Sequence, residues 1–336
     1  MAVLPLVGCT TDKNIYEPKS LDNNIYEPKA VITDENYLKV MGANPKASII
    51  AQGFQWCEGP VWDIKRDCLY FTDVPQNKAF RWDKTSDAET FLYPSGAEGV
   101  EGFREPGANG LFYDKSSKIL LCNHGRRAVE RLDPDTGTRE LLIGAYKGKK
   151  FNSPNDIVIS KTGHIFFTDP PYGLEGLDQS PLKELEFNGV YHLTPEGDVR
   201  LIDTSLSFPN GIALSPDETS LYVNQSDPNL PIMKRYKFGD NFKVTHEDVI
   251  YNFSSHMGDN MHGLPDGMAV DLLGNIFATG PGGIYILSPE GHLLGQILLD
   301  RASSNCAFGE DGQTLFITNQ DRVLRMRTQT YGVLWG

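Results

Sequence analysis

The chain has 336 residues, of which 40% are hydrophobic and 22% are charged, and its formal net charge is −13. This composition is that of a globular protein, and the 33 glycines and 21 prolines favour many short turns over long helices. Proteins that bind nucleic acids usually present a basic face to the phosphates, so the negative charge argues against a nucleic-acid partner and favours metal cations or neutral small molecules.

The first nine residues have the form of a bacterial lipobox, Leu6-Val7-Gly8-Cys9, although a basic start is missing and the apolar part is short. A lipobox would make Cys9 a lipid anchor and the protein a periplasmic or membrane-anchored lipoprotein. A chance apolar start would leave the protein cytoplasmic. The sequence NIYEPK then occurs twice, at residues 14–19 and 24–29, in a polar stretch that we expect to be a solvated tether. No run of about 18 apolar residues is present, so we expect no membrane-spanning segment.

A repeat runs through the rest of the chain. Six segments each begin with an oxygen-bearing side chain, continue through a short, mostly apolar run and end at Asp, Ser or Glu. They are residues 58–63, 109–114, 155–160, 210–215, 266–271 and 305–310. Their starts lie 39 to 56 residues apart, which is the period of a propeller blade, and each is followed by further apolar runs separated by turns.

We therefore predict an all-β protein, a six-bladed β-propeller with four antiparallel strands per blade. Residues 47–330 form this single domain, after an N-terminal signal, tether and lead-in (1–46) and before a C-terminal tail (331–336). The sixth unit lacks an outer strand after Met326. We expect residues 48–51 to supply that strand and close the ring. The alternative is a β-sandwich with fortuitous spacing.

The first strand of every propeller blade lines the central channel, so the six segments place a ring of side chains around it. These are Glu58, Asn109, Asn155, Asn210, Asp266 and Asn305. In one repeat, such a residue would be an ordinary turn residue. Six in one channel are costly to bury unpaired and are oxygen ligands of the kind that hard cations require. We predict one divalent metal, Ca²⁺ first, although Mg²⁺, Mn²⁺ and Zn²⁺ can also occupy oxygen-rich sites.

The second strand of each blade returns to the same rim, so the residue fifteen positions after each ring residue should form a pocket wall. These residues are Asp73, His124, Pro170, Gln225, Pro281 and Gln320. We expect substrate contacts from Asp73, His124 and Tyr172, the last in a rigid Pro-Pro-Tyr segment. His124 is either a proton shuttle or a hydrogen-bonded structural residue. The histidines are too few near the rim for a histidine-based zinc cluster.

The five cysteines, at positions 9, 57, 68, 122 and 306, have no CxxC spacing, so we expect mostly free thiols. In a hairpin Cys57 lies opposite roughly Asp73, which excludes a bridge to Cys68. The sequence contains no GxSxG elbow, no P-loop and no HExxH motif, and so gives no support to serine hydrolysis.

Several motifs resemble those of one family. They are WCEGPVW (56–62), FREPGANG (103–110), FNSPND (151–156), FTDPPYG (167–173), PNG (209–211), LPDGM (264–268) and SNCAFG (304–309). In this order they resemble the gluconolactonase, regucalcin and diisopropyl-fluorophosphatase group, bacterial gluconolactonases most of all, over roughly residues 47–328. The resemblance implies a six-bladed calcium-type propeller.

The resemblance also implies metal ligands at Glu58, Asn210 and Asp266, with Asn155 as a fourth ligand or a substrate contact. One position departs from the family pattern. Regucalcin-like members carry an arginine two residues before the Asn155 position, and here that residue is Ser153. Sugar recognition is therefore expected to differ from theirs.

The resulting hypothesis is a hydrolase that opens a sugar lactone. The metal polarises the carbonyl and orients water, Asp266 is the catalytic base, and Glu58 is purely a ligand. Asn109, Asn155 and His124 hold substrate hydroxyls. Two alternatives remain: a hydrolase of aryl esters or organophosphates on the same frame, and a non-catalytic propeller that keeps a structural calcium and binds a sugar or protein at its rim.

Overall fold

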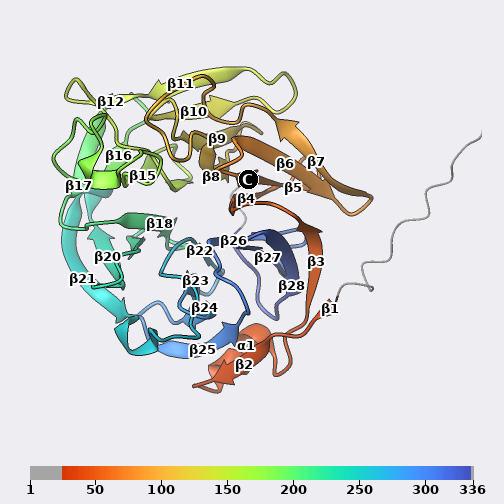
Figure 1. Cartoon of the computed structure of the whole chain (residues 1–336). Coiled ribbons are helices and arrows are strands. Elements are labelled where there is room, and N and C mark those ends of the chain that lie inside the picture. The colour runs from red at the N-terminus through yellow and green to blue at the C-terminus, as the bar shows by residue number, and fades with distance from the viewer. Residues whose placement is uncertain (1–24, 334–336) are drawn as a thin grey trace, which may run out of the picture.

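The computed structural model describes residues 25–333, which form six antiparallel sheets around a central axis (Figure 1). Blade 1 contains β4 (Cys57–Asp63), β5 (Cys68–Asp73), β6 (Lys78–Asp83) and β7 (Ser86–Leu92). Blade 2 contains β8 (Ala108–Tyr113), β9 (Ile119–Asn123), β10 (Ala128–Leu132) and β11 (Arg139–Ile143). Blade 3 contains β14 (Ile157–Ile159), β15 (Ile165–Asp169), β16 (Gly189–Leu193) and β17 (Val199–Asp203).

The other half of the ring repeats this order. Blade 4 contains β18 (Pro209–Leu214), β19 (Ser220–Gln225), β20 (Ile232–Phe238) and β21 (Val244–Asn252). Blade 5 contains β22 (Met268–Val270), β23 (Ile276–Gly280), β24 (Gly283–Leu287) and β25 (Leu293–Leu298). Blade 6 contains β26 (Asn305–Gly309), β27 (Thr314–Asn319), β28 (Arg322–Arg327) and β3 (Ala47–Gln52). The predicted six-bladed propeller with four strands per blade is confirmed.

The smaller elements lie outside this pattern. They are the strands β1 (Ile25–Tyr26) and β2 (Lys29–Ile32), the hairpin β12 (Ala145–Tyr146) and β13 (Lys149–Lys150), the helix α1 (Asn36–Met41), and single 3₁₀ turns at Leu177–Gln179, Asp240–Phe242 and Ser254–His256. None of the helices within residues 25–333 is long and apolar enough to cross a membrane.

The ring closes by pairing the two ends of the domain. Strand β3 pairs antiparallel with β28, with Ser48 opposite Arg325 and Ala51 opposite Val323. The prediction that residues 48–51 supply the outer strand of the last blade is confirmed. Because closure hydrogen-bonds the first described strand of the propeller to its last, no blade is left to be completed by another segment.

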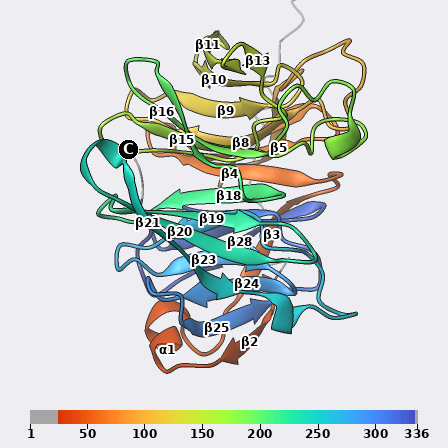
Figure 2. The same ribbon diagram turned by 90° about the vertical axis from the view of Figure 1, so that its left-hand side faces the viewer.

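The second NIYEPK copy is not a free tether, which corrects the prediction for residues 25–29. Strand β1 pairs with β3, and β2 adds a fifth strand to blade 5 beside β25. Helix α1 follows and lies beside β2 and β25 (Figure 2). It buries Tyr37, Val40 and Met41 against blades 5 and 6. The strands β1 and β2 have only two and four residues and are mostly exposed, so they are too short to show a hydrophobic period. The first copy and the Cys9 lipobox lie outside the described residues.

The hydrophobic core is divided into six clusters, one between each pair of neighbouring blades. Inner strands are buried on both faces; every residue of β4 and β5 is buried, whereas β7 is mostly exposed or half-buried. Strands buried on both sides read as continuous apolar runs, which is why the inner strands were visible in the sequence. At the seam between blades 1 and 6, Trp62 stacks on Phe316 with ring centroids 5.4 Å apart.

The described cysteines, 57, 68, 122 and 306, are free and buried. Cys57 lies opposite Asp73 in the β4–β5 ladder, as predicted, and Cys68 lies opposite Asp63 at the other end of it.

In four of the six blades the innermost strand meets its neighbour through a glycine that follows the ring residue; in blades 3 and 6 that position is Asp156 and Cys306. A Cβ on Gly110 would stand 2.6 Å from the carbonyl oxygen of Asn155, and one on Gly211 would stand 2.1 Å from that of Asp266. The first strands of blades 1, 2 and 4 are also bulged at this point. Bulges bend a strand locally, and glycine allows two backbones to approach closely. The paired motif of an oxygen-bearing residue and a glycine therefore brings the inner strands together around the axis.

Candidate active site

A cavity of about 660 Å³ opens over the axial channel, at the end where the first strands begin. Five of the six predicted ring residues line it together: Glu58, Asn109, Asn155, Asn210 and Asp266. Side chains that lie on five different blades thus converge on one space whose volume is typical of a small-molecule site. Figure 1 shows the first strands β4, β8, β18, β22 and β26 gathered around this axis.

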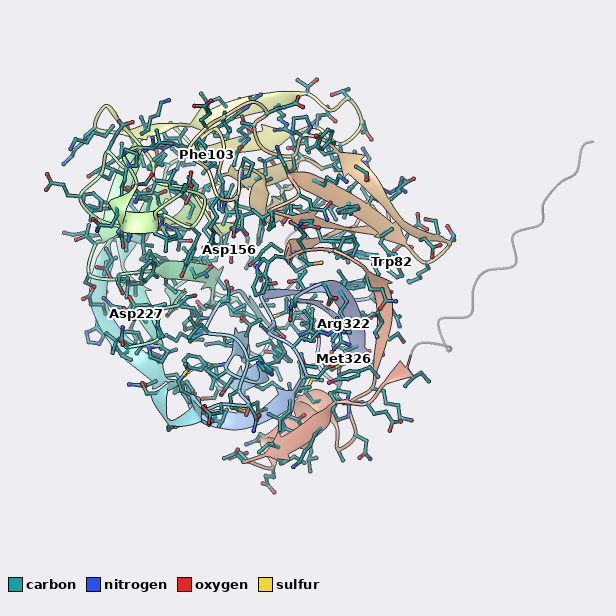
Figure 3. All side chains as sticks on the ribbon, in the orientation of Figure 1. Trp82, Phe103, Asp156, Asp227, Arg322 and Met326 are labelled. Carbon is teal, nitrogen blue, oxygen red and sulfur yellow. The ribbon has the colours of Figure 1, made fainter. Side chains whose placement is uncertain are left out.

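The sixth ring residue, Asn305, does not line this cavity. It lines a smaller, mostly apolar cavity of about 90 Å³ deeper in the channel, together with Asp156. Its Oδ1 accepts the backbone N–H of Cys306 at 2.8 Å, and its side chain lies close enough to the carboxyl groups of Glu58 and Asp156 to act against the increase in their pKa. Asn305 therefore supports the site from below. Figure 3 shows Asp156 near the centre of the ring.

Three carboxyl groups influence one another in the channel. Burial, and then the charge of Asp156, raise the pKa of Glu58 above its ordinary value. Burial, and then the charges of Glu58 and Asp156, raise the pKa of Asp266 well above its ordinary value. Burial also raises the pKa of Asp156 to about 6, although Ile157 and Ile212 donate backbone N–H groups to it. Anionic charge is thus concentrated where a cation would offset the repulsion.

The lining residues fit a hard divalent cation. Within residues 25–333 no group of three or more His, Cys, Asp and Glu side chains could hold a metal ion. A metal in this cavity therefore requires amide oxygens besides Glu58 and Asp266, and such all-oxygen sets suit Ca²⁺ and Mg²⁺. Asn210 is oriented for this role, since its Nδ2 donates to Ser226 Oγ at 2.8 Å and turns Oδ1 away from that serine.

The backbones of the ring residues are held by the preceding blade. Thr72 Oγ1 donates to the carbonyl oxygen of Asn109 at 3.1 Å, and Thr168 Oγ1 donates to that of Asn210 at 2.7 Å. Asn224 Nδ2 donates to the carbonyl oxygen of Asp266 at 2.6 Å. Each bond fixes the start of one inner strand against the second strand of its neighbour. The ring side chains are therefore presented by rigid strands rather than by loops.

The predicted rim residues do not line the cavity, which corrects that part of the sequence analysis. Asp73 is fully buried and accepts the backbone N–H groups of Gln55 at 2.9 Å and Trp56 at 3.3 Å. Gln225 is buried too, and its Oε1 accepts the N–H of Ser207 at 2.8 Å. The second strand does return to the cavity end, but the loop that enters each first strand folds over it. These side chains hold those loops in place.

His124, which we predicted to contact the substrate, does not line the cavity either and lies behind its wall. The side chain is fully buried, and Nδ1 lies 3.2 Å from the carbonyl oxygen of Glu105. Its Nε2 has no hydrogen-bond partner in the described structure. Burial lowers the pKa of His124 to about 4, and the Arg104 charge contributes in the same direction. This geometry favours the structural role over the proton shuttle.

Tyr172 does line the cavity, as predicted. Its ring stacks on Phe208 with centroids 5.7 Å apart, and its loop is held by Ser153, whose Oγ donates to the carbonyl oxygen of Pro170 at 2.6 Å and accepts the N–H of Gly173 at 2.9 Å. Ser153 is buried beneath this loop and does not reach the cavity. It therefore positions the loop that carries Tyr172.

Sequence reasoning missed most of the wall. The additional lining residues are Trp56, Arg104, Glu105, Ser226, Pro228, Met257, Gly263, Leu264, Ala302 and Ser303. Most belong to the loops that lead into the first strands. Arg104 and Glu105 stand in the FREPGANG motif, which was the available signal for them, whereas the loop around Met257 carries no repeat that could have indicated it.

Comparison with known proteins agrees with this architecture. Residues 56–321 match the family model described as SMP-30/Gluconolactonase/LRE-like region. The chain is 46% identical over 299 residues to a gluconolactonase of Zymomonas mobilis, covering 87% of this chain and 84% of that protein. It is 30% identical over 282 residues to lactonase drp35 of Staphylococcus aureus, covering 80% and 77%. A solved gluconolactonase of Xanthomonas campestris superposes with a TM-score of 0.76 at 29% identity, covering 89% and 95%.

Proposed function

The chain belongs to the SMP-30/gluconolactonase/LRE-like family, and from that premise we propose that it is a metal-dependent lactone hydrolase that opens a sugar lactone to the aldonic acid. The observation that carries the proposal is the convergence of Glu58, Asn155, Asn210 and Asp266 on one cavity. Its similarity to a gluconolactonase along most of both chains supports the substrate class.

We assign the metal to Glu58, Asn155, Asn210 and Asp266, with Ca²⁺ as the first candidate. When bound there, a divalent cation supplies Lewis-acid polarisation of the lactone carbonyl. Asp266 accepts a proton from the attacking water, whose oxygen forms a bond to the carbonyl carbon. The bond between the carbonyl carbon and the ring oxygen then breaks, and the ring oxygen takes the proton from Asp266 to become a hydroxyl group, which restores the Asp266 carboxylate. Asn109 and Tyr172 line the same cavity and contact the substrate.

The test combines metal removal with one substitution. Chelation of the protein is expected to abolish gluconolactone hydrolysis, and added Ca²⁺ to restore it. Asp266→Asn keeps the shape of the side chain but removes the base and a charged ligand, so kcat should fall at least about 100-fold, the lower range for general-base catalysis.

Three substrates distinguish the alternatives on the same frame. Gluconolactone, phenyl acetate and paraoxon should be compared at equal metal concentration. The highest metal-dependent kcat/KM is expected on gluconolactone. A higher value on either of the others would identify an aryl esterase or organophosphate hydrolase. Tight metal binding without turnover of any lactone would instead identify a binding propeller, and undiminished lactone turnover by Asp266→Asn would remove Asp266 from its assigned role.

A further inference from the structure

The cavity contains one positive charge among the described residues that line it. Glu58, Glu105 and Asp266 are acidic, the other lining residues are neutral, and Arg104 is the single cation. None of the roles assigned above uses Arg104 or Glu105. Both side chains belong to the wall, and Glu105 is close enough to Asp266 for its charge to raise the pKa of that carboxyl group.

The loop that carries Arg104 is fixed to the loop that carries Tyr172. The backbone N–H of Arg104 donates to the carbonyl oxygen of Gly173 at 3.0 Å, and Phe103 forms a β-bridge with Leu174. The N–H of Glu175 donates back to Gly102 at 2.9 Å. His124 holds the same loop from behind through the carbonyl oxygen of Glu105. Figure 3 labels Phe103, which lies farther from the axis than Asp156. The backbone at Arg104 is therefore held in a fixed position at the cavity wall.

The Arg104 side chain is oriented by its neighbour. Nε and Nη2 donate to the same oxygen of Glu105, Oε1, at 3.0 and 2.5 Å. The Arg104 side chain is 52% exposed, whereas that of Glu105 is 16% exposed. A guanidinium group has five N–H donors, so donors remain for a ligand after these two bonds. The pair thus offers a fixed donor group and a carboxylate acceptor next to each other, at no net charge.

Neighbouring hydroxyl groups on a sugar ring match such a pair, because one hydroxyl can accept from the guanidinium while the next donates to the carboxylate. A second anionic group on the substrate fits less well, since Arg104 is already paired and the cavity is otherwise acidic. Ser153 cannot take this role because it is buried under the Pro170–Gly173 loop.

We propose that Arg104 is a specificity residue that binds ring hydroxyls of a polyhydroxylated, neutral lactone, and that Glu105 orients it. This inference rests on the proposed lactone hydrolase function and names the substrate class within it. It separates sugar lactones from lactones with an unsubstituted ring, which lack the hydroxyls that Arg104 recognises.

The first test compares two lactones in Arg104→Met, which keeps an unbranched stem without donors. The kcat/KM for glucono-δ-lactone should fall about 10- to 100-fold, mainly through KM, which is the range for losing a hydrogen bond to a charged group. The kcat/KM for δ-valerolactone should change less than about threefold. Arg104→Lys should recover part of the loss, because it restores the charge but not the fork.

Arg126→Met is the matched control. Arg126 is similarly exposed, at 55%, and forms a similar ion pair with Glu130, but it does not line the cavity. It should leave both rates unchanged. An equal loss on both lactones in Arg104→Met, or no loss on either, would overturn the assignment.

A binding measurement makes the proposal testable without turnover. Gluconate and 5-hydroxyvalerate carry the same carboxylate and differ in their other hydroxyls, so titration calorimetry on the metal-loaded protein isolates hydroxyl recognition. The wild type should bind gluconate more tightly, and Arg104→Met should lose that preference. A wild type without the preference, or a variant that keeps it, would refute the role of Arg104. Failure of lactone turnover alongside a preserved binding preference would refute the proposed reaction instead.

Discussion

His124 and Asp266 were both predicted to act on the substrate, but the two side chains differ in their access to the cavity. Asp266 lines the cavity, whereas His124 is fully buried behind its wall. The ring residues could be predicted because six repeats point to one slot on the axis. The residues that form the cavity wall could not be predicted in the same way. The spacing of fifteen residues shows that a side chain lies at the cavity end of the molecule, but not whether it faces the cavity or lies behind a loop. Which segment covers that end depends on loop conformation, and the loops do not repeat.

A buried neutral histidine has a measurable effect on stability. The folded-state pKa of His124 is about 4, below the ordinary value of about 6.5, so the unfolded chain takes up a proton between these pH values and the folded chain does not. The stability that His124 contributes is therefore present above pH 6.5 and is lost as the pH falls to 4.

We predict the consequence for His124→Asn, whose amide can still donate to the Glu105 carbonyl but does not titrate. The free energy of unfolding should favour the wild type over the variant by about 2 kcal/mol more at pH 7.5 than at pH 5.0. Urea unfolding at both pH values measures this difference. Because the charge of Arg104 faces His124, the same experiment in Arg104→Met should show a smaller dependence on pH. A difference that does not change with pH would mean that His124 is protonated in the folded protein.

At the scale of elements, the inner strands are held by contacts that leave no room for side chains. Gly59, Gly110, Gly211 and Gly267 each follow a ring residue and press against the next blade. The sequence showed these glycines as part of the repeat, but it did not show why glycine is required there. The reason is a distance between two backbones of neighbouring blades, which a one-dimensional pattern does not contain. Outer strands and the lead-in were less predictable, because packing of Tyr37 and Val40 against blades 5 and 6 creates α1 from a short segment with little pattern of its own.

Gly211→Ala tests this seam. Its Cβ would stand 2.1 Å from the carbonyl oxygen of Asp266, so blades 4 and 5 would have to separate at the axis. We expect a loss of about 3 kcal/mol or more in the free energy of unfolding, at the upper end for overpacking, with a matching loss of lactonase activity. Denaturant unfolding gives the value.

Gly144→Ala is the matched control for that substitution. Gly144 is not in the left-handed region, and its nearest atoms to an added Cβ lie 3.7 Å away or farther. Its stability should stay within about 0.5 kcal/mol of the wild type, as for most unconstrained sites. Equal effects at the two glycines would show that the close approach of the inner strands does not limit the fold.

At the scale of the whole molecule, closure of the ring creates the site. Pairing of β3 with β28 fixes blade 6 against blade 1, and only a closed ring makes residues from blades 1 to 5 share one cavity. The number of blades, the closing strand and the positions of the ring residues could be predicted from the repeat. Each sequence repeat forms one blade, so equivalent positions of the repeats lie around the same axis. The substrate-facing wall could not be predicted, since it is built from the non-repeating loops. The site therefore depends most on the convergence of the ring side chains at the axis.

A crystal structure of the protein grown with Ca²⁺ measures that convergence directly. We predict one cation on the axis, with oxygen atoms of Glu58, Asn155, Asn210 and Asp266 about 2.3–2.6 Å from it, the distance range of Ca²⁺ ligands in proteins. A cation bound elsewhere, or a cavity in which these four side chains do not contact a common ion, would contradict it.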